Sequence, residues 1–202
     1  MTDVIRELIP ENILRENGAQ LVEGARGMEI FSEGEAPVFY YQVESGAVKM
    51  AHFAEDGREF VQGVFHKGES FGEPAIFGDF PYPSGAFMLE KGRLWKLPSE
   101  KLMEILEHRP DLHFKFTRNL SHRLRYKAIM QSENVGAAPQ RILRLMEYSM
   151  EQAQACRPYQ VSLTRQQIAD LTGLRVETVI RTIKKLEQKG DLEIADKKVW
   201  LK

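Results

Sequence analysis

The sequence is poor in the features that build disulfides, clusters and membrane spans. It holds one cysteine, Cys156, so it forms neither an internal disulfide nor an iron–sulfur cluster, which needs several thiolates. No apolar run is long enough to cross a bilayer, and residues 1–18 lack the apolar stretch of a signal peptide. These absences predict a cytoplasmic protein without a membrane partner.

The five histidines are scattered, and this limits the metal chemistry that we expect. Metal enzymes on jelly-roll barrels need a tight His-x-His with a carboxylate and a further histidine, whereas His52 and His66 stand alone. No nucleophile–base grouping stands out either. We therefore expect no metal, no cofactor and no enzymatic activity. A cupin-like enzyme on such a barrel is the alternative.

Charge is distributed unevenly along the chain, although the formal net charge is only −1. Residues 139–202 carry 12 Lys and Arg against 8 Asp and Glu, while the other 138 residues carry 16 against 21. Such a contrast between two parts of a chain is a hint of nucleic-acid binding by the basic part.

Short segments between glycines dominate the first hundred residues. The glycines that recur every 10–12 residues are Gly34, Gly46, Gly57, Gly68 and Gly78. The segments between them are rich in β-branched and aromatic residues, and turn signals at this spacing predict an all-β sandwich or barrel. A tight turn is expected at residues 55–58. Ahead of this region, residues 3–17 are expected to form one or two short helices broken near Pro10.

A long helix is expected next, over residues 111–133. Its apolar residues form a narrow seam in which each lies four positions after the last: Leu112, Phe116, Leu120, Leu124 and Ala128. A thin stripe on a polar helix suits packing against a partner helix, which predicts a homodimer. The alternative is a single helix that lies on its own barrel. Residues 134–136 and Pro139 indicate a hinge before the next helix.

Residues 163–189 hold the most specific pattern. Thr164 and Gln167 fit a capping box, and Gly173 stands where a turn between two helices needs a positive φ. The positions expected to be buried in the second helix are Val179, Ile183 and Leu186. With the small Ala169 in the first helix, this spacing predicts a helix-turn-helix. Residues 192–201 then predict a two-stranded wing whose Trp200 packs against the helices.

In this geometry the second helix enters the major groove with its N-terminal, outward residues at base edges. Arg181 can donate two hydrogen bonds to guanine, Glu177 can accept one from cytosine, and Val176 can touch a thymine methyl. Arg175 also faces outward. The side chains suited to phosphate contacts are Arg165, Thr178, Lys184, Lys185 and Lys189. The alternative for Glu177 and Arg181 is an ion pair on a solvated helix face.

This order of elements resembles the CRP/FNR family of bacterial transcription regulators over essentially the whole chain. The motifs are Gly46-Ala47-Val48-Lys49, Asp56-Gly57-Arg58-Glu59, Gly68-Glu69-Ser70-Phe71-Gly72-Glu73, Leu163-Thr164-Arg165-Gln166-Gln167-Ile168-Ala169 and Glu177-Thr178-Val179-Ile180-Arg181. The resemblance implies an α+β fold with an N-terminal β jelly-roll barrel (1–110), a dimerisation helix with a hinge (111–138) and a C-terminal winged helix-turn-helix (139–202). It also implies a palindromic operator in double-stranded DNA, contact with RNA polymerase, and Glu177 and Arg181 as base readers. Val176 departs from the arginine that often precedes this glutamate.

The resemblance also implies where a sensor ligand would bind. In cyclic-nucleotide members, a Gly-Glu and an Arg-Ser pair of the barrel hold the ribose and the cyclic phosphate, and a Thr-Ser pair of the long helix holds the base. The residues implied for this pocket are Phe71, Gly72, Glu73, Ser84, Gly85 and Lys127. Pro83 stands where the arginine belongs, and a bidentate arginine is hard to replace. We expect weak or no binding of cyclic AMP, and a barrel that serves another small molecule or none.

Overall fold

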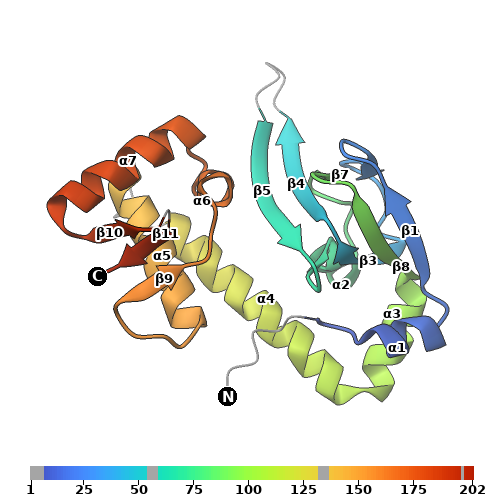
Figure 1. Ribbon diagram of the computed structural model, residues 1–202. Coiled ribbons are helices and arrows are strands. Elements are labelled where there is room, and N and C mark those ends of the chain that lie inside the picture. The colour runs from blue at the N-terminus through green and yellow to red at the C-terminus, as the bar shows by residue number, and fades with distance from the viewer. Residues whose placement is uncertain (1–6, 54–58, 132–136, 197) are drawn as a thin grey trace. The chain divides into compact units, whose positions relative to one another are not determined.

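The computed structural model describes residues 7–53, 59–131, 137–196 and 198–202. They form two compact units, which meet between Ser121 and His122 within one long helix. Each unit mixes helices and strands, and this confirms the predicted fold class (Figure 1). The predicted turn at 55–58, the hinge residues 134–136 and the start of the predicted first helix lie outside the described residues.

Two four-stranded antiparallel sheets build the first unit. One sheet has the order β1-β8-β3-β6, with strands at Gln20–Gly24, Gly92–Pro98, Phe39–Ser45 and Ser70–Phe71. The other has the order β2-β7-β4-β5, with strands at Glu29–Phe31, Gly85–Met88, Ala47–Phe53 and Glu59–His66. This eight-stranded arrangement is the predicted jelly-roll barrel.

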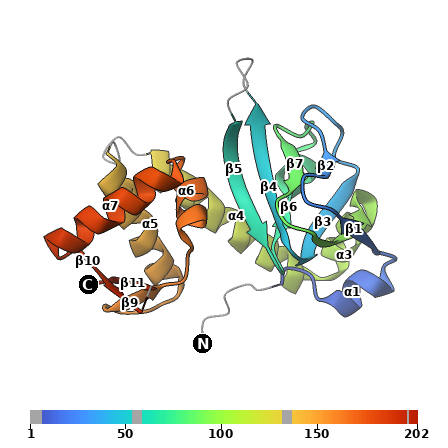
Figure 2. The same cartoon turned by 45° about the horizontal axis from the view of Figure 1, so that its top comes forward.

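Strand β3 is buried on both faces because it lies between the barrel interior and a layer of helices. Tyr41 and Val43 belong to the interior cluster, whereas Tyr40 belongs to the cluster on the other side, since successive side chains alternate across a strand. Helices α1 (Glu11–Glu16) and α3 (Ser99–His108) contribute to that outer cluster (Figure 2). A short helix, α2 (Glu73–Gly78), follows β6.

Gln42 fixes the chain ahead of α1 and explains why that segment is not helical. Its side-chain amide accepts a hydrogen bond from the Ile9 N–H and donates one to the Ile9 carbonyl, both at 3.0 Å. The Tyr40 hydroxyl donates to the same amide oxygen at 2.7 Å. Residues 7–10 are therefore held against the sheet in a non-helical conformation, and within the described residues only Glu11–Glu16 of the helices predicted over residues 3–17 is observed.

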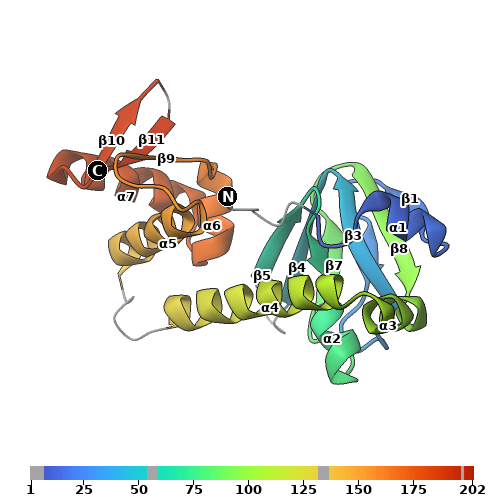
Figure 3. The ribbon, with the colours of Figure 1, turned by 90° about the horizontal axis from the view of Figure 1, so that it is seen from below.

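Helix α4 (Pro110–Gln131) is one continuous helix (Figure 3). The predicted seam does not occupy a single face of it. Leu112 and Phe116 are each 1% exposed and lie in the outer cluster of the barrel. There the ring centroids of Phe116 and Tyr40 lie 5.8 Å apart. Leu124 is 70% exposed. Residues spaced by four drift around a helix of 3.6 residues per turn by about 40° each step. The first half of the seam was therefore assigned wrongly, because the barrel already covers it.

The second unit holds α5 (Ala138–Gln152), α6 (Arg165–Thr172) and α7 (Val176–Lys189) around one apolar cluster. Its sheet has the order β10-β11-β9, with strands at Leu192–Ala195, Lys198–Leu201 and Tyr159–Val161. The sequence predicted the first two strands but not β9. Val199 and Leu201 enter the cluster, so the alternating Trp200 lies on the other face of its strand, and the prediction that it packs against the helices was wrong.

Candidate nucleic-acid interface and barrel interior

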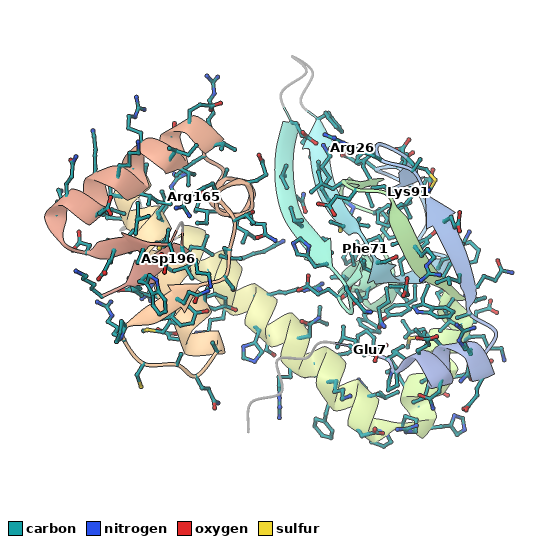
Figure 4. All side chains as sticks on the ribbon, viewed as in Figure 1. Glu7, Arg26, Phe71, Lys91, Arg165 and Asp196 are labelled. Carbon is teal, nitrogen blue, oxygen red and sulfur yellow. The ribbon has the colours of Figure 1, made fainter. Side chains whose placement is uncertain are left out.

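Helix α6 begins with a complete capping box. The Thr164 hydroxyl accepts from the Gln167 N–H at 3.1 Å, and the Gln167 amide oxygen accepts from the Thr164 N–H at 2.8 Å. Two backbone donors that a helix start leaves unsatisfied are thereby bonded. Arg165, the first helical residue, is labelled in Figure 4. Burial lowers the pKa of its guanidinium.

The turn after α6 sets the direction of α7. Gly173 adopts φ 67°, a left-handed conformation that would be strained for a residue with a side chain. Its backbone N–H donates to the Ala169 carbonyl. Thr172 is buried just before it, and its hydroxyl donates to the Ile168 carbonyl at 2.5 Å. Arg141 of α5 donates to the Thr172 carbonyl at 3.4 Å. The turn is therefore tied to both neighbouring helices.

Helix α7 divides into a buried face and an exposed face. Val179, Ile183 and Leu186 are at most 2% exposed and lie in the cluster, as the sequence predicted. The opposite face lines an open hollow of about 520 Å³. Its lining residues are Glu177, Ile180, Arg181, Lys184, Lys185 and Gln188. Four of the residues predicted to contact DNA thus lie together on one surface.

The cations of this surface have no carboxylate partner among the described side chains. No ion pair within residues 137–196 and 198–202 involves Arg175, Arg181, Lys184 or Lys185, and none joins Glu177 to Arg181. Elsewhere in the unit, arginines do form ion pairs. Arg144 and Arg157 both pair with Glu147, at 3.4 and 3.0 Å. The surface therefore keeps positive charge that an external anion can neutralise.

One residue of α7 differs from its predicted position, and a second residue, for which no position was predicted, is exposed. Val176 is half-buried and packs against the cluster of the unit rather than facing outward. Ile180, one turn later, is 42% exposed and lines the hollow. The sequence pattern assigned Ile180 no role. Thr178 is half-buried and Arg175 is exposed.

The barrel interior is filled by aromatic rings where the resemblance implied a ligand pocket. The rings of Phe31 and Tyr82 stack, with 3.6 Å between their centroids and 11° between their planes. Phe71, labelled in Figure 4, stacks on Tyr41 at 5.6 Å, also with 11° between planes. The Tyr82 hydroxyl donates to the Phe39 carbonyl at 3.1 Å, which holds the ring in place.

The predicted Gly-Glu pair lies directly beside these rings. A Cβ atom added at Gly72 would stand 3.0 Å from Tyr82 and 3.2 Å from Phe31. Glu73 is fully buried, and its Oε1 accepts from the Ser70 hydroxyl at 2.9 Å. Ser84 is also fully buried, and its hydroxyl oxygen finds no hydrogen-bond partner among the described residues.

Burial dominates the ionisation of the two tyrosines in this interior. Burial, with a smaller contribution from Glu35, raises the pKa of Tyr41 to about 12. Burial also raises the pKa of Tyr82, with further contributions from Tyr41, Glu35 and Glu73. Because aromatic rings fill this space, and Pro83 replaces the arginine, the residues present do not fit a cyclic phosphate.

Lys127, the remaining residue predicted for the pocket, is exposed on the part of α4 that belongs to the second unit. The other five belong to the barrel unit, with Phe71, Gly72, Glu73, Ser84 and Gly85 all buried. In the parts of the chain that the structure describes, no group of three or more His, Cys, Asp or Glu could hold a metal ion. No helix there is long and apolar enough to span a membrane.

Comparisons with known families match both units. The model of the cyclic nucleotide-binding domain matches residues 21–109, and the model of the Crp-like helix-turn-helix domain matches residues 140–202. A "CRP-like cAMP-activated global transcriptional regulator" of Mycobacterium tuberculosis is 28% identical over 187 residues, which cover 90% of this chain and 84% of that protein. The "Fumarate and nitrate reduction regulatory protein" of Salmonella typhi is 26% identical over 181 residues, 87% of this chain and 72% of that protein.

Solved structures share the fold. CprK complexed with OCPA superposes with a TM-score of 0.70 at 20% identity and covers 99% of this chain and 96% of its own. FixK2 from Bradyrhizobium japonicum gives a TM-score of 0.66 at 21% identity, with 91% and 92% covered.

Proposed function

Because this chain belongs to the CRP/FNR family of transcription regulators, we propose that it binds a palindromic operator in double-stranded DNA as a homodimer, with α7 in the major groove. The observation that carries the proposal is the outer face of α7. An acid and several cations stand there without ion pairs to other described side chains, on a helix whose direction is fixed by Gly173. The two half-sites lie one helical turn apart, about 34 Å.

Each of the proposed contact residues has a role that its chemistry supports. Arg181 donates two hydrogen bonds to O6 and N7 of a guanine, and Glu177 accepts from the amino group of a cytosine. The side chains that contact phosphates are Arg165, Arg175, Thr178, Lys184, Lys185 and Lys189. Among the described side chains no ion pair forms on this face, and this supports these roles, because phosphates then supply the missing anions.

The experiment that tests this function is binding of the full chain to duplexes selected from a random library. Specific binding should weaken steeply as salt rises, because bound cations release counterions from DNA. Arg181→Ala should cost about 1–3 kcal/mol on the selected duplex and relax the choice at one base pair. Arg144→Ala removes the same charge from a residue paired with Glu147, and should change binding little. Unchanged binding by Arg181→Ala would refute the groove assignment.

The dimer seam is proposed along the exposed stripe of α4. Its residues alternate at intervals of three and four, the spacing of a coiled-coil seam: Phe114, Thr117, Ser121, Leu124 and Ala128. Phe114 and Leu124 are 74% and 70% exposed. The Thr117 and Ser121 hydroxyls donate to carbonyls four residues earlier, at 3.1 and 2.8 Å, so they need no polar partner across a seam.

The barrel is proposed to respond to no cyclic nucleotide, and the stacked Phe31 and Tyr82 favour a regulator that needs no effector. A different small molecule that displaces these rings is the alternative. RNA polymerase is proposed as the protein partner, since the relatives are named as transcriptional regulators. Residues 1–110, 111–138 and 139–202 are the proposed sensor, dimerisation and DNA-binding segments.

A further inference from the structure

Ile180 is an exposed apolar residue on a surface that is otherwise charged or polar. Within the described part of residues 137–202 it is the one large hydrophobic side chain that is more than about two-fifths exposed, at 42%. It lies outside the cluster that Val179 and Ile183 enter. A β-branched residue also gives an exposed helix position no local advantage over alanine or lysine. Folding of the unit therefore does not account for isoleucine here.

The neighbours of Ile180 indicate what this side chain meets. Glu177 lies three residues before it, Arg181 follows it, and Lys184 lies four residues after it, all lining the same hollow. Cations around one apolar group disfavour an apolar protein partner. They suit the major groove, where phosphates flank the base edges and the thymine 5-methyl is the apolar group available for contact.

We infer that Ile180 is a specificity-determining residue that reads a thymine through its 5-methyl group. The inference rests on the proposed function, in which α7 lies in the major groove. It replaces the role predicted for Val176, which packs against the interior of its own unit. Glu177 and Arg181 then read neighbouring base pairs by hydrogen bonds, while Ile180 adds one apolar contact per half-site.

The test removes the methyl from the DNA and the side chain from the protein. In the selected operator, each thymine is replaced in turn by deoxyuridine, and binding by the full chain is measured by fluorescence anisotropy. One position per half-site should lose about fourfold in affinity, the factor for one buried methyl group, and about fifteenfold when both half-sites are changed. Ile180→Ala should bind thymine and deoxyuridine duplexes equally, whereas Ile180→Val should keep most of the difference.

The outcomes separate the inference from the function. Specific binding in which Ile180→Ala keeps the full deoxyuridine effect, or in which the wild type shows none, would overturn the role of Ile180 alone. A chain that selects no duplex would overturn the proposed function and the inference together. We expect Ile180→Ala to fold, because Ile180 lies outside the cluster. Circular dichroism, together with unchanged discrimination at the base pair that Glu177 reads, checks that this variant is folded.

Discussion

At the scale of single residues, the barrel interior shows how burial controls ionisation. Tyr41 is 6% exposed among aromatic rings, and its hydroxyl would lose more hydration on ionising than it would in the unfolded chain. The Glu35 carboxylate adds a like charge that also opposes the tyrosinate. Both causes favour the neutral phenol in the folded state.

This shift predicts how stability depends on alkaline pH. The pKa of Tyr41 is near 10 when unfolded and about 12 when folded, so the folded state holds one more proton between these values. The contribution of Tyr41 to the free energy of unfolding is therefore fully present below about pH 10 and is lost as pH rises through about 12. Tyr41→Phe should make this decline shallower by about one proton. Urea unfolding at several pH values in this window measures the slope, and a slope parallel to that of the wild type would contradict the assignment.

The residues of the candidate interface were predictable to different degrees. Glu177 and Arg181 could be assigned from spacing alone, because both lie well away from the buried face of α7. Val176 and Ile180 lie near the boundary between the two faces. Which of them is covered depends on how α7 packs against its neighbours, and sequence periodicity does not resolve that.

At the scale of elements, α6 depends on its capping box for a defined start. Thr164→Ala removes the acceptor for the Gln167 N–H and should cost about 1 kcal/mol. The loss should appear as faster amide hydrogen exchange in the first turn of α6 and as a lower free energy of unfolding in urea. Ser162→Ala alters an exposed residue two positions earlier and serves as the control. Equal stability of the two variants would show that the cap contributes nothing.

The elements themselves were largely predictable, and the exceptions have physical causes. Glycine spacing and a capping box are local signals, and they identified the barrel strands and the helix-turn-helix. Strand β9 has only three residues and is stabilised by pairing with β11. The partners are distant in the sequence, since Val161 pairs with Val199, 38 positions later. The segment before α1 is set by its contact with Gln42, 33 positions on. The seam of α4 depends on which face the barrel covers.

At the scale of the whole molecule, the filled barrel predicts that the protein does not respond to cyclic AMP, whereas the mycobacterial relative is named as cAMP-activated. Titration calorimetry should give no heat of binding, and cyclic AMP should leave DNA affinity unchanged, because Phe31 and Tyr82 occupy the interior and no arginine neutralises the phosphate. The Mycobacterium tuberculosis protein, named as cAMP-activated, provides the positive control. Micromolar affinity would mean that the rings give way to the nucleotide.

The exposed stripe of α4 predicts the assembly state and, through it, the affinity for DNA. Leu124→Glu would place like charges opposite each other across a two-fold seam, so sedimentation should show a monomer. Binding of a palindrome should then fall by a factor of about 10² or more, since the second half-site no longer benefits from a high effective concentration, while a single half-site should bind as before. Met103→Glu changes another exposed apolar residue, on α3, and should leave the dimer intact. A Leu124→Glu dimer would place the seam elsewhere on the molecule.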